Sequence, residues 1–366
     1  MVPNTEGFLY PVVDEKLCIG CHLCQRTCPI HTPKEIHPQV ESAFAAHTED
    51  DHILNESSSG GVFSLLGQAV LDQGGLVFGA AFDGPRRVRH VSACNEEEFS
   101  LLRGSKYVQS ETGDSYQEVK RALLLNRLVL FSGTPCQIAG LQAFLGKDYE
   151  NLFCIDTICH SVPSPKAWNT FLDEVEQTAG SPVTLANFRE KKTGWERYSL
   201  YLRFENGSEQ RYTGPDNFYV QSFVRGLDTR PSCYSCPAVG KNHASDITLG
   251  DFWGIQSVAP ACYCQQGTSL VILHTEKGRQ LLEQCRSRMV LTEVDFSAAI
   301  AQNPAYSVSA KPHPDREQVM AQLDTVPFHE LVRPYLGPTK EDQRRTRLDH
   351  SFPLRTLRWI KRKIIS

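Results

Sequence analysis

Four closely spaced cysteines near the start of the chain carry the strongest chemical signal in the sequence. They are Cys18, Cys21, Cys24 and Cys28. Their spacing, C-x2-C-x2-C-x3-C followed directly by Pro29, is that of bacterial 4Fe–4S ferredoxins, where a tight turn aims successive thiolates at one cubane. The alternative is a structural zinc site, which more often uses two well-separated C-x2-C pairs. Residues 1–32 therefore predict a ferredoxin-type 4Fe–4S segment.

Four further cysteines lie far apart in the sequence but can meet in the fold. They are Cys136, Cys159, Cys233 and Cys236. Cys136 comes after an apolar strand pattern over 128–132. Cys159 ends the next such pattern, over 152–158, so both thiols lie at one sheet edge if these strands are parallel neighbours. The C-x2-C pair at 233–236 would complete four thiolates, enough for one cluster. A zinc site and buried, inert cysteines remain open as alternatives.

Three turns rich in small residues could cradle a phosphate group. Ser57–Gly61 precedes a helical pattern, and Gly133–Gln137 opens another helix directly after a strand. Arg103–Tyr107 combines two cations with a hydroxyl group and an aromatic ring. Backbone N–H groups at a helix start bind anions. None of the three turns contains G-x-G-x-x-G or a P-loop, and Gly-Ser turns are usually no more than turns.

The elements that must position these residues can be placed from the apolar pattern. We expect helices over 63–71, 115–125, 137–145 and 278–286, and strands over 76–82, 128–132, 152–158, 269–274 and 289–294. This alternation predicts an α/β (α+β) fold with a mixed sheet and helices. Asn206-Gly207 between 198–204 and 210–213 is a strong hairpin signal. Asp246–Gly254 fits either a core strand that ends in a tight turn or part of a site.

The domain organisation is indicated by changes in composition along the chain. We expect a ferredoxin-type segment over 1–32, a polar linker over 33–56, a core domain over 57–310 and a polar C-terminal extension over 311–366. A chain of 366 residues exceeds one average domain.

The use of cysteine indicates a reducing compartment, so we expect a cytoplasmic protein. Thirteen cysteines, an odd number, fit a secreted disulfide framework poorly. Cys94, Cys154 and Cys285 lie on apolar stretches and are expected in the core, whereas Cys262 and Cys264 have no assignment. The sequence shows no signal peptide and no run of eighteen apolar residues. A net charge of −4 indicates no bulk attraction to nucleic acid.

The order of the motifs resembles the coenzyme F420 hydrogenase/dehydrogenase beta-subunit family. The motifs run Ser59-Gly60-Gly61, Gly104-Ser105-Lys106-Tyr107, Gly133-Thr134-Pro135-Cys136-Gln137, Cys159-His160, Lys191 to Trp195, Cys233-x2-Cys236 and Asp246 to Gly254. The resemblance covers about residues 1 to 285. The family usually has glycine after Cys-His, where this chain has Ser161.

The resemblance implies FAD, one 4Fe–4S cluster in the core domain and an appended ferredoxin-like module. The FAD contacts expected from it are Ser59, Gly60, Gly61, Gly104, Ser105, Lys106, Tyr107, Gly133, Thr134 and Gln137. Clusters move single electrons and flavins exchange hydride, so we expect electrons to pass between the clusters and FAD for hydride transfer with coenzyme F420 or another organic acceptor. We assign no catalytic residue, and His160 is as readily structural as functional.

The expected partners are a small-molecule hydride acceptor and an electron-carrying protein, such as ferredoxin or a hydrogenase/dehydrogenase-type subunit. Three other functions stay open: an electron-transfer subunit for a partner enzyme, a reductase of a polysaccharide-biosynthesis pathway, and a zinc-stabilised binding module without redox activity. The basic, partly apolar tail over 344–366 could contact an anionic membrane surface, although a solvated or docked helix is the plainer expectation.

The N-terminal segment corresponds to only half of a two-cluster ferredoxin module, which carries two such cysteine runs. Residues 6–14 resemble the hairpin that joins the two runs, so we expect either a start clipped from a longer gene or a half-module. Without a partner hairpin, Phe8 and Tyr10 should lose packing and the segment should be mobile.

Overall fold

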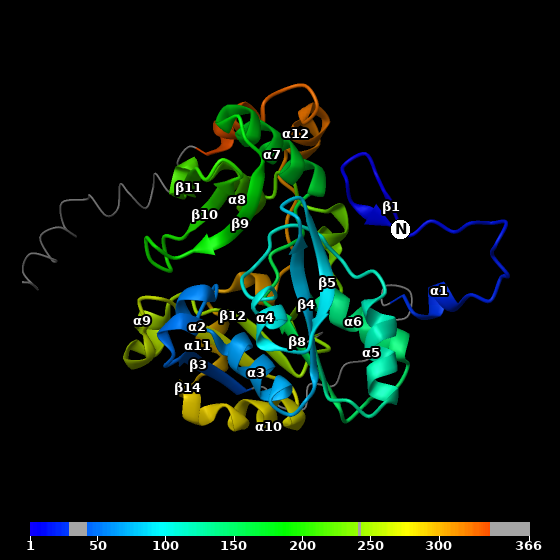
Figure 1. The fold of residues 1–366 in the computed structure, drawn as a ribbon, viewed down its shortest axis with the longest axis vertical. Helices are drawn as coiled ribbons and strands as arrows, with labels where there is room; N and C mark the ends of the chain where they lie inside the picture. Colours follow the sequence, from blue (N-terminus) through cyan, green and yellow to red (C-terminus); the bar gives the residue numbers. More distant parts are fainter. Residues whose placement is uncertain (29–41, 241–242, 337–366) are drawn as a thin grey trace, which may run out of the picture.

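The largest element of the fold is a mixed β-sheet (Figure 1). The computed structural model describes residues 1–28, 42–240 and 243–336. Within these residues nine strands pair in the order β14-β3-β13-β12-β8-β7-β4-β5-β6. They are β3 (Ser42–Thr48), β4 (Leu76–Asp83), β5 (Arg87–Ala93), β6 (Ser110–Glu111), β7 (Val129–Gly133), β8 (Leu152–Thr157), β12 (Ile247–Asp251), β13 (Ser269–Leu273) and β14 (Met289–Val294). The neighbours β12, β8, β7 and β4 run parallel. The expected mixed sheet, with strands 128–132 and 152–158 as parallel neighbours, is confirmed.

Helices cover both faces of this sheet, because successive apolar side chains of its strands point to opposite faces. In β7, Leu130 packs against α3 (Val62–Leu71) and α10 (Glu276–Gln284), whereas Val129 and Phe131 pack against α5 (Ser115–Leu124) and α6 (Pro135–Leu145). Successive residues of a strand point to opposite faces. Smaller helices complete this half: α2 (Asp51–Glu56), α4 (Glu96–Ser100), α9 (Ile255–Val258) and α11 (Phe296–Ile300). The four long helices expected from the sequence are present.

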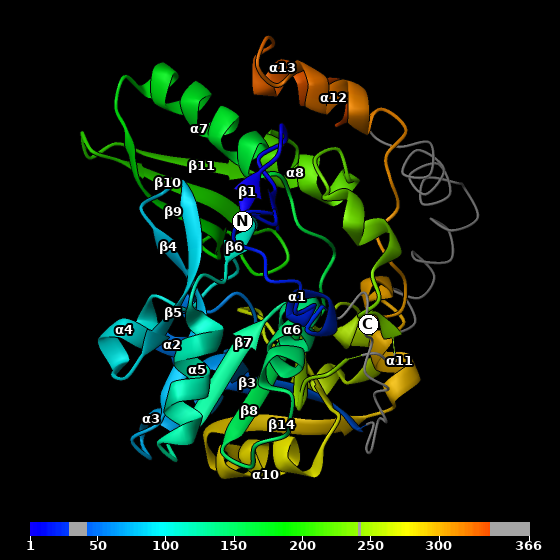
Figure 2. The same ribbon diagram turned by 90° about the vertical axis from the view of Figure 1, so that its right-hand side faces the viewer.

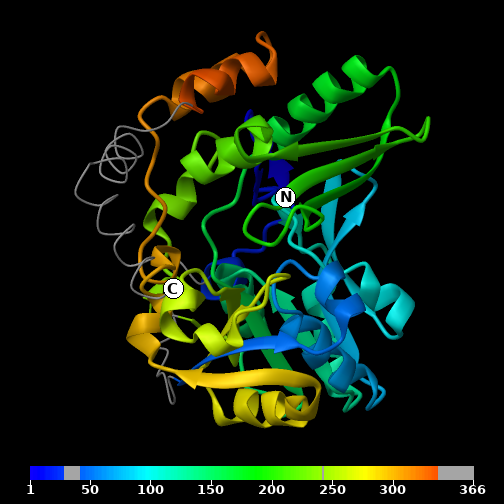
Figure 3. The same cartoon turned by 90° about the vertical axis from the view of Figure 1, so that its left-hand side faces the viewer.

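A second hydrophobic core lies above the large sheet. It is formed by a small antiparallel sheet and the helices that pack on it (Figure 3). Its strands, in the order β11-β10-β9, are β9 (Val183–Glu190), β10 (Ser199–Phe204) and β11 (Glu209–Thr213). The Asn206-Gly207 hairpin joins β10 to β11. Four helices pack with this sheet: α7 (Pro165–Ala179), α8 (Phe218–Arg225), α12 (Arg316–Gln322) and α13 (Phe328–Val332). Trp168 and Phe171 stand at the centre of its aromatic cluster.

Two expected domain boundaries are wrong. Part of the predicted linker, residues 42–56, belongs to the core, because Ala43, Ala45 and Ala46 of β3 are buried between β13 and β14. Part of the predicted polar extension is also core: α12 and α13 bury Val319 and Val332 against the second core. The basic tail over 344–366 lies outside the described residues. Within the described residues no helix is long and apolar enough to span a bilayer.

The N-terminal hairpin of β1 (Val2–Pro3) and β2 (Leu9–Tyr10) packs where the two cores meet (Figure 2). Phe8 is fully buried. Arg316 forms two hydrogen bonds with the carboxylate of Glu6, at 2.9 and 2.6 Å. Arg230 donates to the Leu9 carbonyl, and its guanidinium lies over Tyr10 at 4.3 Å. The expectation that this hairpin lacks packing is therefore wrong; the question of a clipped gene start stays a prediction.

Candidate functional site

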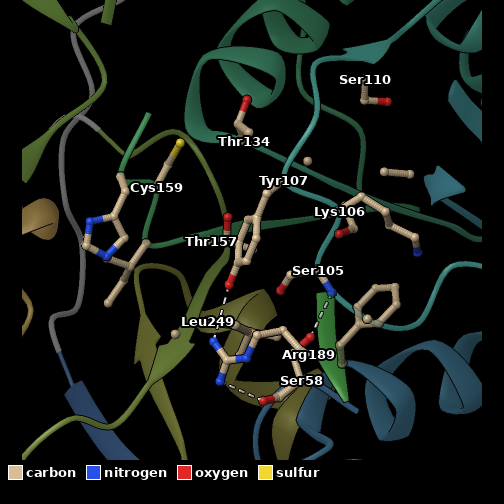
Figure 4. Close-up of a pocket in the computed structure, with 18 of the residues that line it drawn as sticks. Ser58, Ser105, Lys106, Tyr107, Ser110, Thr134, Thr157, Cys159, Arg189 and Leu249 are labelled. Atoms are coloured by element: carbon tan, nitrogen blue, oxygen red, sulfur yellow. Dashed lines mark hydrogen bonds between the residues drawn. The ribbon is translucent and has the colours of Figure 1, made fainter. Parts of the chain in front are cut away.

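A large cavity of about 610 Å3 opens at the carboxyl ends of the parallel strands, beneath the small sheet (Figure 4). The three turns singled out in the sequence all border it, together with the ends of β8 and β12 and with Arg189 of β9. Ligands of open α/β sheets bind at this edge of the sheet. Nine of the ten expected FAD contacts line the cavity; the exception is Gly60.

Gly60 contacts neighbouring strands rather than the cavity. Its N–H donates to Ser269 Oγ at 2.9 Å, and a Cβ on it would lie 2.3 Å from the Ala46 carbonyl oxygen. The prediction of Gly60 as a direct cofactor contact is therefore not supported by its position. It lets the turn lie against β3 and β13, and this places Ser59 and Gly61 at the cavity.

Gly61, the N-cap residue of α3, has φ +80°, a conformation that glycine adopts without strain. No side chain caps this helix start, and Gly61, Val62 and Ser64 border the cavity. Ser59 uses its hydroxyl group to donate to the Thr268 carbonyl at 3.0 Å. The uncapped start of α3, which borders the cavity, is thus the part of this turn that can bind an anion.

Residues 104–107 form the adjoining part of the cavity wall. Gly104 has φ +80°, and the Ser105 N–H donates to Ser58 Oγ at 2.7 Å, which ties this turn to the first. Tyr107 stacks on Phe223 with ring centroids 5.1 Å apart. An aromatic ring in this position can pack against a planar cofactor ring.

Lys106 holds the turn at 104–107 from within. Its ammonium donates to the carbonyls of Leu101 and Arg103 at 3.0 and 2.7 Å. An ammonium carries three N–H donors, so these two bonds leave one for a ligand. Burial lowers the pKa of Lys106 to about 7. A phosphate group in the cavity would favour the charged form of this side chain.

The third turn is fixed by a capping box at the start of α6. Thr134 is the N-cap, and the Gln137 side chain folds back to accept from the Thr134 N–H at 2.9 Å. A Cβ on Gly133 would lie only 3.1 Å from Gln137 Oε1. Gly133 and Gln137 therefore shape the helix start that carries Cys136, in addition to lining the cavity.

Arg189 is a site residue that we did not predict. Its guanidinium forms two hydrogen bonds with Asp251, at 2.7 and 3.2 Å, and also donates to Tyr107 Oη and the Ser58 carbonyl. It lies 4.0 Å from the ring centroid of Tyr198. Burial alone would lower the pKa of Arg189, but Asp251 outweighs this and raises it. Arg189 therefore joins the first two turns and β12 into one rigid wall.

Two further residues support the cavity wall: Lys191, from the Lys191 to Trp195 motif, which does not itself border the cavity, and His90, which does. Lys191 donates to the carbonyls of Ser59 and Gln266, which fixes the first turn, and burial lowers its pKa to about 8. His90 hydrogen-bonds to Ser110 Oγ at 2.7 Å and the Ser132 carbonyl at 3.0 Å, and burial lowers its pKa to about 4. The sequence pattern of β5 gives no sign that this histidine faces a cavity, and only the fold shows it.

The four core cysteines converge on a second, smaller cavity. Cys136 lies in the first turn of α6, Cys159 comes shortly after β8, and Cys233 and Cys236 lie at the short helix Pro231–Ser235. All four border a cavity of about 40 Å3. Burial raises the pKa of Cys159, and the neighbouring Cys136, Cys233 and Cys236 raise it further. The structure therefore brings these four thiols to one cavity, and their assignment to a cluster stays a prediction.

The four thiols share a cavity but are not arranged as a preformed metal site. Within the described parts of the chain, no three His, Cys, Asp or Glu side chains are arranged to hold a metal ion. Burial raises the pKa of Cys233 to about 11, so a metal that binds this thiol displaces its proton. The four-cysteine donor set itself is the one that 4Fe–4S clusters use.

Ser161, the departure from the family pattern, causes no backbone strain. It is not among the described non-glycine residues with positive φ, which are His22 and Asn126. Its hydroxyl group lies 3.1 Å from Thr229 Oγ1, and its carbonyl accepts from the Cys159 thiol at 3.7 Å. The serine therefore helps to hold the segment that carries Cys159.

The N-terminal cysteines are placed differently. Cys18, Cys21 and Cys24 are exposed, and Cys28 is half-buried just after the short helix α1 (Leu23–Arg26).

Of the three cysteines expected in the core, Cys154 and Cys285 are buried, but Cys94 is exposed because it lies just beyond the end of β5. Cys262 is buried, and Cys264 is half-buried.

Comparisons with known proteins identify two parts of the chain. Residues 126–299 match the model for the C-terminal part of the family described as "Coenzyme F420 hydrogenase/dehydrogenase, beta subunit". Residues 11–34 match the model described as "4Fe-4S binding domain". Among solved structures, a chain of the F420-reducing [NiFe] hydrogenase complex from Methanosarcina barkeri is 18% identical, with a TM-score of 0.48; the match covers 79% of this chain and 90% of that chain. Comparison with curated proteins found no match.

Proposed function

Because residues 126–299 of this chain belong to the coenzyme F420 hydrogenase/dehydrogenase beta-subunit family, we propose that it is an iron–sulfur flavoprotein oxidoreductase. The four core cysteines hold a 4Fe–4S cluster, FAD binds in the large cavity, and the physiological reaction is hydride exchange with coenzyme F420 or another organic acceptor. The observation that supports the proposal most directly is that the two cavities share wall residues. Cys136, Cys159 and Cys233 border both the small cavity and the large one.

The large cavity has the properties that a dinucleotide cofactor requires. Its volume of about 610 Å3 falls within the usual range for ligand pockets, roughly 300–1,000 Å3. The uncapped start of α3 and the remaining N–H of Lys106 can bind a pyrophosphate. Tyr107 and Phe223 offer an aromatic wall. When bound there, FAD would supply the chemistry of hydride transfer.

The chain's own contribution is placement and exclusion of water. Arg189 and Lys191 fix the turns that form the walls, and the buried His90 stays neutral, since burial lowers its pKa to about 4. His160, next to Cys159 in the sequence, borders both cavities. No step requires a proton from it.

A second function is favoured by the surface around the N-terminal motif. Ile19 is 88% exposed, and Leu17 and Leu23 are exposed beside the cysteines. Exposed apolar side chains beside a redox centre suit the docking of a protein partner. The chain would then act as an electron-transfer subunit of a larger enzyme, and its own turnover would be slow or absent.

Flavin and iron analysis followed by turnover tests the proposal. The chain is purified without oxygen, reconstituted with iron, sulfide and FAD, and analysed by heat release of flavin. We expect about one FAD per chain and hydride transfer to F420, NAD(P)+ or a related acceptor when dithionite or reduced ferredoxin supplies electrons. Failure to bind flavin after reconstitution overturns the flavoprotein assignment. Bound flavin without turnover of any acceptor favours the subunit function.

A further inference from the structure

The N-terminal hairpin is tied by hydrogen bonds to the segments that carry the core cysteines, and the function proposed above makes no use of this link. The junction is buried. Phe8 of the hairpin is fully buried, and Thr229 and Arg316 beside it are 1% and 5% exposed. Polar groups are buried at little cost only where they are hydrogen-bonded, so their partners define how the hairpin is held.

Two arginines join the hairpin to residues 228–230. Arg316 of α12 donates through both Nη atoms to the Glu6 carboxylate, at 2.9 and 2.6 Å, and through Nε to the Thr229 carbonyl at 2.7 Å. Arg230 donates through Nη2 to the Leu9 carbonyl at 2.9 Å. A guanidinium stays protonated in proteins and has no acceptor atom, so the direction of each of these bonds is fixed.

Residues 228–230 lie between the segments of two core cysteines. On one side they lie against the stretch that follows Cys159, because the Arg230 N–H donates to the Val162 carbonyl at 2.8 Å. On the other side the chain leads to Cys233, whose N–H donates to the Arg230 carbonyl at 3.0 Å. The backbone of Arg230 therefore sets how these two segments lie relative to each other.

The hairpin also contacts the stretch after Cys159 directly. Ser164 Oγ donates to the Glu6 carbonyl at 2.6 Å, and the Ser164 N–H donates to the Asp228 carbonyl at 2.9 Å. Gly7 has φ +82°, and a Cβ on it would lie 2.8 Å from the Lys166 backbone nitrogen. This close approach of two backbones shows that the hairpin fits one position on the core.

We propose that the N-terminal hairpin holds the core cysteines in place, with Glu6, Arg316 and Arg230 as positioning residues of the core metal site. The inference rests on the proposed core cluster for its functional consequence. Residues that orient metal ligands typically contribute about 10–100-fold to metal affinity. Coupling of this kind is reciprocal, so a filled core site in turn holds the hairpin, and the N-terminal cysteine motif that follows it, against the core.

The first measurement is hydrogen–deuterium exchange in the metal-free full chain, which does not depend on any cluster. Glu6→Gln removes the charge that pairs with Arg316, so the amides of residues 159–164 and 228–236 should exchange faster. Glu190→Gln is the matched control. Glu190 forms an ion pair with Arg211 at 3.1 Å, and its side chain is 18% exposed against 22% for Glu6, but it belongs to the small sheet. This control should leave exchange in the two segments unchanged.

The second measurement is the strength of iron binding in the full chain after reconstitution with iron and sulfide. The parent carries Cys18→Ser, Cys21→Ser and Cys24→Ser, so that only the core cysteines hold iron. We expect the chelator concentration that removes half of the iron to fall about tenfold in Glu6→Gln and in Arg230→Met. It should stay at the parent value in Glu190→Gln.

Exchange that is unchanged in both segments of Glu6→Gln overturns the inference. Iron binding as strong in Glu6→Gln and Arg230→Met as in the parent also overturns it, and so does an equal loss in Glu190→Gln. A parent that holds no iron would instead show that the proposed cluster is wrong, and the exchange measurement alone then decides whether the hairpin positions the cysteine segments.

Discussion

The buried pair of Arg189 and Asp251 should contribute strongly to stability as well as to the cavity wall. Their side chains are 4% and 14% exposed, and two hydrogen bonds join them. Removal of one partner leaves a buried, uncompensated charge, which costs about 3–5 kcal/mol. We therefore expect Arg189→Met and Asp251→Asn each to lower the free energy of unfolding by that order. Asn at 251 can still accept from Trp195 Nε1, which now bonds Asp251 Oδ1 at 2.8 Å.

A double-mutant cycle isolates the pair from the rest of the wall. In the double variant neither charge remains, so its loss should be smaller than the sum of the two single losses by about 2 kcal/mol or more. Urea unfolding followed by circular dichroism gives the four free energies. Arg87 and Glu111 form the matched control, because they too make two hydrogen bonds, at 3.2 and 2.8 Å, but lie at the surface. If the buried pair couples no more strongly than this exposed pair, Arg189 and Asp251 do not hold the wall together.

Three further predictions concern pH, the hairpin and the cofactor. Burial raises the pKa of Asp228 to about 7, so the folded state holds a proton that the unfolded state releases; the free energy of unfolding should fall by up to ~4 kcal/mol as pH rises from 4 to 7. Asp228→Asn should remove this slope in urea titrations, and an unchanged slope would contradict the assignment. Glu6→Gln breaks the charge pair with Arg316, so limited proteolysis within residues 1–28 should become faster. Glu15→Gln, at an exposed site, should leave the rate of proteolysis unchanged. Equal rates in the two variants would mean that the pair does not anchor the hairpin. Lys106→Ala should weaken FAD about tenfold, measured by flavin fluorescence, because a charge-assisted bond to phosphate is lost, and Lys120→Ala on α5 should leave affinity unchanged.

The core cysteine site could be predicted because it depends on short stretches of sequence. The apolar patterns over 128–132 and 152–158 each mark one strand, and parallel neighbours bring the residues after them to one sheet edge. That rule alone places Cys136 beside Cys159. The turns at 57–61 and 133–137, which border the large cavity, could be predicted for the same reason, since each leads into a helix.

The features that the sequence did not show depend on distant partners. β3 is rich in alanine, so residues 42–48 look too weakly apolar for a central strand until β13 and β14 pair with it on both sides. Gly60 looks like a ligand contact in its turn, but its neighbour is the Ala46 carbonyl. Arg189 meets Asp251 across 62 residues of sequence, and no local pattern indicates such a pair. The hairpin over 2–10 looked unsupported because its partners, Arg230 and Arg316, lie far along the chain.

Metal analysis of a full chain without the N-terminal ligands tests the central claim, the core cluster, most directly. In the variant with Cys18, Cys21 and Cys24 replaced by serine, we expect about four irons and four sulfides per chain after anaerobic reconstitution, because one 4Fe–4S cluster remains on Cys136, Cys159, Cys233 and Cys236. A further Cys159→Ser substitution should remove most of this iron, whereas Cys94→Ser, at an exposed cysteine outside the site, should not. Zinc in place of iron, or iron that is insensitive to Cys159→Ser, would contradict the assignment of these four cysteines to a cluster.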